Sequence, residues 1–136
     1  MEAEKQIYSG KRKTAVSKVR VVAGSGKIFY NRLPHTELSL FHRLALTEPL
    51  RIYELVLGEP LTFNFEVRTS GGGREAQIEA SRLAIAKALI ALTGSDVLKK
   101  AYIKYDRNMV VADVRRREAR KPGDSRARSK RQKSYR

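Results

Sequence analysis

Alternation of apolar and polar residues predicts strands in the first half of the chain. In residues 14–23 the small and apolar side chains fall on one face, whereas Lys18 and Arg20 fall on the other. Successive side chains of a strand point to opposite faces, so this segment is predicted as a half-buried strand with a basic outer face. Residues 24–26, Gly-Ser-Gly, favour a turn, and the apolar residues within 27–30 then predict a second strand. Together the two strands predict a hairpin.

A third strand is predicted over residues 61–68. Apolar residues alternate there with Thr, Asn, Glu and Arg, so one face is expected to be buried and the other exposed. Two short helical stretches are predicted before it. One begins after Pro34, and the other follows residues 47–49 and ends at Gly58, because glycine is a common stop signal for a helix.

The longest predicted helix covers about residues 74–93, after the glycines at 71–73. Gly94 ends it, and a shorter helix is predicted over about residues 96–104. Residues 109–111, Met-Val-Val, are predicted as a short fourth strand. Small residues recur along one side of the long helix and would let it lie close to a sheet: Ala80, Ala84, Ala88 and Ala91.

The predicted order of elements is β-β-α-α-β-α-α-β. This order favours an α/β (α+β) two-layer sandwich, in which helices cover one face of a mostly antiparallel four-stranded sheet. The other face of the sheet would be open and basic. We expect a globular domain over residues 1–113 and an extended tail over residues 114–136.

Charge divides the chain at the same place. The 136 residues carry a net charge of +15. Residues 114–136 hold 11 bases and two acids, whereas residues 1–113 hold 18 bases and 12 acids. The tail has too few apolar residues to offset the entropy of folding, so we expect it to be disordered when free and ordered only on a polyanion. A nucleic acid is the favoured partner, ahead of an acidic membrane surface.

Other classes of function are disfavoured by what the chain lacks. It has no cysteine, which excludes disulfides and thiol chemistry, and its two histidines are too few for a dedicated transition-metal site. It also lacks an apolar run of about 20 residues and a signal peptide, so no membrane association is expected. Asp106 and Asp113 have no neighbouring nucleophile or metal ligands, so neither an enzyme nor a cofactor is expected.

Two short motifs have competing interpretations. The glycines at 71–73 could cradle a phosphate, but residues 74–77 lack the Lys-Ser/Thr of a P-loop. A tight turn with positive backbone dihedrals is therefore favoured, and an additional contact with an RNA backbone stays open. The three bases at 11–13 are either a phosphate contact or a solvated strand start. The basic strand face that follows favours the contact.

Three stretches match a known family. They are Gly-Lys-Arg-Lys-Thr-Ala-Val at 10–16, the glycine, glutamine and alanine pattern at 71–89, and Gln-Lys-Ser-Tyr-Arg at 132–136. With these residues the chain resembles the universal small-subunit ribosomal protein family nine, in its archaeal and eukaryotic form. Bacterial members end in Ser-Lys-Arg, whereas Tyr135 precedes the last arginine here. Some eukaryotic members have an aromatic residue where this chain has Arg131.

The resemblance implies a position in the ribosome and a feature of the fold that periodicity alone does not indicate. The family is expected in the head of the small ribosomal subunit of the cytoplasmic ribosome, bound to small-subunit ribosomal RNA and beside other head proteins. Its sandwich is expected to contain a left-handed β-α-β crossover, against the usual handedness. The tail is expected to reach tRNA in the peptidyl site. Carried over to this chain, the tRNA-binding residues would be Lys133, Ser134, Tyr135 and Arg136.

Ribosomal RNA is expected to bind the basic residues of the strand face, the long helix's start and the tail. An alternative is a chromatin-like basic DNA-binding module, which shares the charge but not the family motifs. Association with a ribosomal particle or with DNA would distinguish them. The expected ribosomal RNA-binding residues are Lys11, Arg12, Lys13, Lys18, Arg20, Arg74, Arg115, Arg116, Arg117, Arg120, Lys121, Arg126, Arg128, Lys130 and Arg131.

Overall fold

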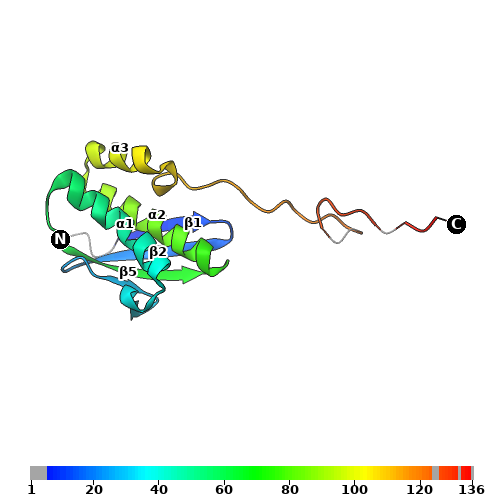
Figure 1. The fold of residues 1–136 in the computed structure, drawn as a ribbon, viewed down its shortest axis with the longest axis horizontal. Coiled ribbons are helices and arrows are strands. Elements are labelled where there is room, and N and C mark those ends of the chain that lie inside the picture. Colours follow the sequence, from blue (N-terminus) through cyan, green and yellow to red (C-terminus); the bar gives the residue numbers. More distant parts are fainter. Residues whose placement is uncertain (1–5, 124–125, 132, 136) are drawn as a thin grey trace.

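The computed structural model describes residues 6–123, 126–131 and 133–135. Within them, strands and helices follow one another up to Met109, and the C-terminal segment then runs away from the body as an extended chain (Figure 1). None of the helices in these ranges is long and apolar enough to cross a membrane. The elements are β1 (Ile7–Arg12), β2 (Ala15–Ala23), β3 (Ile28–Tyr30), β4 (Leu33–Pro34), the 3-10 helix η2 (His35–Glu37), α1 (Leu40–Leu57), β5 (Phe63–Ser70), α2 (Arg74–Thr93), α3 (Asp96–Tyr105) and the 3-10 helix η3 (Arg107–Met109).

The sheet is five-stranded and mixed, in the order β1-β2-β5-β3-β4. Strands β3 and β5 are parallel, and the other neighbouring pairs are antiparallel. Parallel neighbours need a crossover connection, and α1 supplies it between β3 and β5. The prediction of a mostly antiparallel four-stranded sheet is therefore wrong, although the mixed α/β class is right. The handedness of this β-α-β unit stays a prediction.

The predicted hairpin between β2 and β3 is also wrong, because β5 lies between these two strands. The glycine-containing loop that joins them pairs with the start of β5 instead. The backbone N–H groups of Ser25 and Lys27 donate to the side-chain oxygen of Asn64, at 2.9 and 3.0 Å. The Gly24 N–H donates to the carbonyl of Thr62 at 2.8 Å. The loop therefore separates β2 and β3 by the width of one strand, and β5 pairs with both of them.

A single helix, α1, replaces the two short helices predicted between the strands. Proline lacks an N–H, and the residue before it avoids the helical region, which is why the sequence predicts a break at Pro49. Here Pro49 is buried, and its carbonyl accepts a 2.7 Å hydrogen bond from Tyr102 of α3. The burial of Pro49 and this contact with α3 favour a continuous helix over the predicted break. The predicted end at Gly58 is confirmed, with a left-handed φ of 66°.

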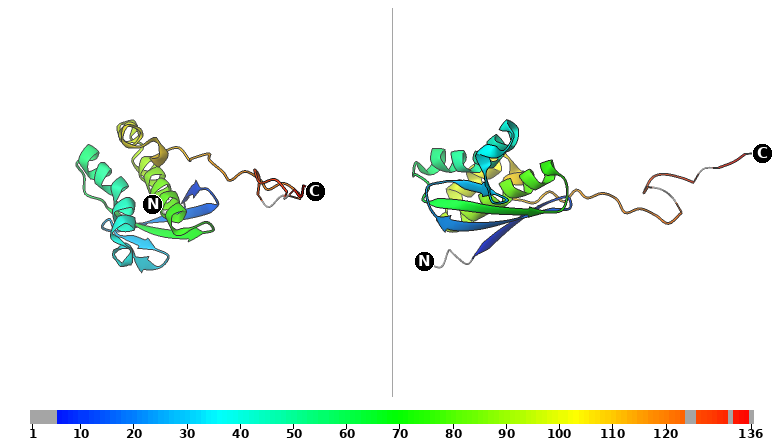
Figure 2. Two further views of the ribbon diagram at one scale, coloured as in Figure 1. Left: turned by 45° about the vertical axis from the view of Figure 1, so that its right-hand side comes forward. Right: turned by 90° about the horizontal axis from the view of Figure 1, so that it is seen from below.

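Helix α2 lies directly on β1 and β2, which explains the small residues along its buried side. Gly10 of β1 faces this helix, and a Cβ at Gly10 would collide with the carbonyl oxygen of Ala80 and lie 2.9 Å from the Ala84 nitrogen. The predicted close approach of helix and sheet is confirmed for Ala80, Ala84 and Ala88, which are fully buried, whereas Ala91 is exposed because it lies past the end of the contact. All three α-helices lie on one side of the sheet, and the opposite face is open (Figure 2).

Helix α3 forms the outer part of the helical layer, where it packs on α1 and α2. Its Leu98 and Tyr102 are fully buried. The chain then turns through η3 instead of forming the strand predicted at 109–111. The Asp106 side chain accepts from the Asn108 N–H at 2.9 Å, which favours the turn, and Met109 is buried beneath it. After η3 the described residues contain no further helix or strand.

Candidate nucleic-acid interface

The open face of the sheet carries two rows of side chains. Strand register places Ser9, Lys18 and Arg68 side by side across β1, β2 and β5. The adjacent row contains Ile7, Arg20, Glu66 and Phe29, the last from β3. We call these residues, with Lys11 at the end of β1, the open face.

Positive charge dominates this surface. Lys18 and Arg68 stand directly opposite each other, and like charges at such positions destabilise a sheet. In the described part of the chain none of the open-face bases makes an ion pair with an acid. A shallow hollow of about 270 Å³ is lined by Ile7, Lys18, Arg20, Glu66 and Arg68. Three of these five side chains are basic, and basic side chains are the usual contacts of RNA phosphates.

A second basic region lies where the β1–β2 turn meets the start of α2. Lys11, Lys13 and Arg74 are exposed there. The glycine turn is confirmed for Gly71 and Gly72, which have φ values of 71° and 62°. Gly73 differs, because its φ is −99° and it caps the helix. A hydrogen bond stabilises the turn, since the Gln77 side-chain amide donates to the carbonyl of Gly71 at 2.9 Å.

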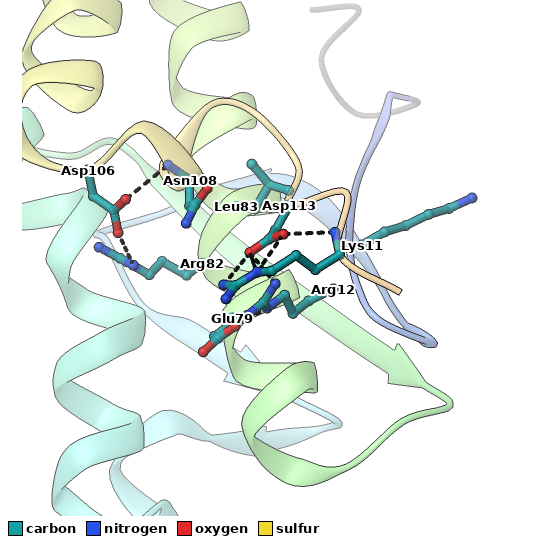
Figure 3. A pocket seen from close by; sticks show the side chains of 9 residues that line it. Lys11, Arg12, Glu79, Arg82, Leu83, Asp106, Asn108 and Asp113 are labelled. Carbon is teal, nitrogen blue, oxygen red and sulfur yellow. Dashed lines mark hydrogen bonds and ion pairs between the residues drawn. The ribbon is translucent and has the colours of Figure 1, made fainter. Parts of the chain in front are cut away.

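Arg12 does not point to solvent with its neighbours Lys11 and Lys13. Its Nε donates to Glu79 of α2 at 2.5 Å, and its Nη1 pairs with Asp113. Only 15% of the Arg12 side chain is exposed. Asp113 is 10% exposed and lies beside Arg12 (Figure 3), and it also accepts side-chain hydrogen bonds from Arg115, at 2.6 Å from Nη2 and 2.9 Å from Nε. We call Arg12, Glu79, Asp113 and Arg115 the clasp.

The clasp joins the root of the tail to the body. The Arg115 side chain and its backbone N–H, both bonded to Asp113, hold the pKa of that carboxyl far below its ordinary value, and Arg12 lowers it further. Beside the clasp, Arg82 pairs with Glu48 at 2.7 Å and with Asp106 at 3.0 Å, which ties α2 to α1 and to the end of α3. A hollow of about 150 Å³ is lined by three of the carboxylates that these arginines bind: Glu79, Asp106 and Asp113.

The remaining predicted tail bases are exposed. Glu118 pairs with Arg128 at 2.8 Å and lies 4.0 Å from Lys121, so part of the charge is compensated within the tail. Arg136 lies outside the described residues. The other predicted tail residues are exposed in the structure: Arg116, Arg117, Arg120, Lys121, Arg126, Arg128, Lys130, Arg131, Lys133, Ser134 and Tyr135.

The two histidines serve the fold. His42 of α1 pairs with Glu75 of α2 at 2.6 Å, and the His35 ring lies 3.3 Å from the carbonyl of Ile28. Among the residues that the structure describes, no group of His, Cys, Asp and Glu side chains could hold a metal ion.

The comparisons with known proteins agree with this description. The family model "Ribosomal protein S9/S16" matches residues 10–136. The chain belongs to this family. Its relatives include a protein named small ribosomal subunit protein uS9 from Methanococcus vannielii, which is 38% identical over 130 residues, covering 93% of this chain and 95% of the relative. A protein with the same name from Methanococcus maripaludis is 38% identical over 131 residues, with the same coverage.

The family match begins at Gly10, where β1 meets α2, and includes the whole tail. It therefore covers the clasp and all of the open face except Ile7 and Ser9. Two bases near this face are absent from the residues expected at the outset, Arg68 of β5 and Arg32 beside a second hollow of about 290 Å³. The alternation of residues 61–68 contains the signal for Arg68, because it places this side chain on the outer face. Arg32 has a φ of 72°, and nothing in the sequence pattern indicates it.

Proposed function

We propose that this chain is a structural component of the small ribosomal subunit and binds ribosomal RNA through its open face and its tail. The family match over residues 10–136 supports the proposal, as do relatives named for the small subunit that it covers almost end to end. A position in the head, in contact with neighbouring head proteins of the cytoplasmic ribosome, completes the proposal. No catalytic step is part of it.

The observation that carries the proposal is the uncompensated pair of Lys18 and Arg68 on the open face. A sheet that kept like charges side by side would lose stability in the free protein. Phosphates bound between them would offset this cost. Such contacts set position and affinity and carry no sequence code, so we propose RNA backbone recognition here and not base readout.

The tail has a separate role in the proposal. Its bases near the root, Arg116 and Arg117, would bind ribosomal RNA and continue the path that the clasp begins. Arginine suits this role because its planar group forks onto phosphates and stacks on bases. The last residues would contact tRNA bound in the peptidyl site: Lys133, Ser134, Tyr135 and Arg136.

The salt dependence of RNA binding tests the electrostatic part. Each phosphate that the protein neutralises adds about 0.7–0.9 to the slope of log affinity against log salt concentration. We expect the full chain to have a much steeper slope on small-subunit ribosomal RNA than a chain ending at Val114. Equal slopes would show that the tail does not act by neutralising phosphates.

Arg136 alone tests the tRNA contact. Its removal takes away one charge-assisted contact, worth at most about 1.5–3 kcal/mol. Small subunits carrying the shortened chain should assemble normally and release peptidyl-site tRNA faster. Arg126→Gln is the control, because it removes one charge from the tail without changing its end. If tRNA dissociates at the same rate with and without Arg136, the tRNA role is wrong.

A chromatin-like DNA-binding module is the alternative. It accounts for the net charge of +15 but not for the family match. Co-sedimentation separates the two, since the ribosomal proposal requires the chain to travel with a small subunit. Recovery of the chain with DNA, and not with the particle, would favour the alternative.

A further inference from the structure

Helix α3 presents a basic surface that neither the open face nor the tail includes. Leu98 and Tyr102 are fully buried against the rest of the helical layer. At 3.6 residues per turn, Lys100 and Lys104 lie about half a turn away from them and point outward. Lys99, on the flank of the helix between Leu98 and Lys100, is exposed as well, and so is Arg107 just after the helix. We call Lys99, Lys100, Lys104 and Arg107 the α3 surface.

Helix stability explains these bases only in part: Lys104 lies in the last turn of α3, where the helix dipole favours a positive charge, but the other positions are not favoured in this way. Lys99 lies in the first turn of α3, where the helix dipole disfavours a positive charge. Lys100 and Lys104 are one turn apart, and like charges at this spacing destabilise a helix by a few tenths of a kcal/mol. Asp96 is the one acid on this side of the helix, and the described residues contain no ion pair to any base of the α3 surface.

The neighbouring acids are already engaged elsewhere. Asp106, between α3 and η3, pairs with Arg82, and Glu48 of α1 pairs with the same arginine. The outer side of α1 differs in its balance of charge, because exposed Arg51 has exposed Glu54 one turn away, whereas the four bases of the α3 surface have Asp96 alone. The positive charge of α3 is therefore left for a partner outside this chain.

The position of α3 indicates which partner. The chain runs from α3 through η3 into the basic tail, so the α3 surface and the root of the tail adjoin (Figure 1). Lys100 and Lys104 are about 6 Å apart along the helix axis, at a rise of 1.5 Å per residue. A row of bases that continues into an RNA-binding tail fits a phosphate backbone better than an acidic protein surface.

We propose that the α3 surface binds a second RNA segment, so that the body holds RNA on both of its sides. Helix α3 lies on the far side of the helical layer from the sheet, as two views show (Figures 1 and 2). One continuous RNA helix on the open face cannot also cover it. The inference rests on the proposed function and extends it, because a protein bound on two sides bridges RNA segments instead of only coating one.

Tethered cleavage of RNA tests the inference directly. The chain has no cysteine, so a single introduced cysteine can carry an iron chelate that cuts nearby RNA. Lys100→Cys probes the α3 surface, Lys18→Cys probes the open face, and Glu54→Cys on the outer side of α1 is the control. Each full-length variant is assembled into small subunits. We expect positions 100 and 18 to cut different segments of the ribosomal RNA, and position 54 to cut weakly.

The outcomes separate this inference from the proposed function. If position 18 cuts and position 100 gives only the signal of position 54, the α3 surface does not bind RNA, whereas the proposed function stands. Cuts by both in one segment, or capture of a protein by position 100, also overturn the inference. If neither position cuts in an assembled particle, the proposed RNA-binding role of the body fails as well.

Charge removal gives an independent measurement. Lys100→Gln should lower the log–log salt slope for binding to small-subunit ribosomal RNA by about 0.7–0.9, the contribution of one phosphate contact. Arg51→Gln is the matched control, since it removes one exposed base from α1. An equal fall in slope for both variants would mean that only the net charge matters, and the α3 surface would then have no specific role.

Discussion

Individual arginines of this chain have different roles although the sequence presents them alike. Arg12 stands between Lys11 and Lys13, yet it alone is largely buried and bonded to carboxylates. Arg115 opens the basic tail, yet its side chain is bound to Asp113. We therefore expect Arg12 to position the tail, and we expect its exposed neighbours to bind RNA.

Asp113→Asn tests this role of the clasp. The amide is neutral, so Arg12 and Arg115 lose their shared anion and the root of the tail should take up a wider range of directions. Spin labels on cysteines introduced at Arg117 and Leu55 would report this as a broader distance distribution. Glu118→Gln is the control, because it breaks ion pairs within the tail and leaves the clasp intact. Identical distributions for both variants would contradict the clasp's role.

The same measurement has a defined dependence on pH. The folded pKa of Asp113 is depressed below the ordinary value of about 3.9, chiefly by hydrogen bonds from Arg115. The stabilisation by the clasp is therefore fully present above about pH 4 and is lost only as the pH falls through the lower folded value. The distance distribution should stay constant from pH 7 to pH 5. Broadening already in that range would mean that another group controls the clasp.

Tyr102 is the buried polar side chain that joins α3 to α1. Tyr102→Phe would remove the hydrogen bond that the carbonyl of Pro49 accepts in addition to its helical one, so we expect the free energy of unfolding in urea to fall by about 0.5–1.5 kcal/mol. Burial, aided by the nearby Tyr53, raises the pKa of Tyr102. The stability linked to its neutral form is thus present below about pH 10 and is lost as the pH rises further. Tyr105→Phe, on the exposed side, should change stability by less than about 0.5 kcal/mol.

At the scale of elements, the contact between β1 and α2 fixes how closely the two layers approach. Gly10→Ala would place a methyl group against the backbone of Ala80 and Ala84. Overpacking of this kind costs about 1–3 kcal/mol, and more where backbone cannot move. Gly73→Ala is the control, since it has open space and a negative φ, and it should cost less than about 1 kcal/mol. Urea unfolding of both variants would show whether the close approach matters.

Local pattern predicted the elements whose signal is local. The long helix α2, the buried face of β2 and the ends at Gly58 and Gly94 follow from periodicity and stop signals. Strand β1 was not predicted, because its inward side chains do not form an apolar row. These positions are Tyr8, Gly10 and Arg12, and they suit the contact with α2. The wrong hairpin has a similar cause, since the partner of β2 and β3 comes from a strand about 40 residues later.

The candidate interface divides in the same way. Its exposed bases could be named from charge and strand alternation, because a basic outer face is a local property. The partners of Arg12 could not, because Glu79 and Asp113 reach it only after α2 and the end of η3 are in place. The α3 surface was missed for another reason. A few lysines on a short helix are usually solvated, and only the burial of Leu98 and Tyr102 and the engagement of Asp106 set them apart.

At the scale of the whole molecule, charge and packing are separated along the chain. The tail holds a net charge of +9 in 23 residues, whereas the first 113 residues hold +6. The buried core ends at Met109, before the tail begins. Because the body packs without the tail, the tail is free to bind RNA. The clasp sets the direction in which the tail leaves the body. The open face, the α3 surface and the tail then engage RNA in different directions from one small domain.

This separation predicts that the body folds without the tail. A chain ending at Val114 lacks none of the core residues, so its free energy of unfolding in urea should equal that of the full chain within the roughly 10–15% uncertainty of extrapolation. Met109→Ala in the full chain should instead lose about 2–5 kcal/mol, because it empties a buried site five residues earlier. Loss of cooperative unfolding in the shortened chain would place the domain boundary inside the tail. In the shortened chain Asp113 keeps Arg12 but loses Arg115. Such a loss of cooperativity would therefore mean that the clasp stabilises the fold as well as directing the tail.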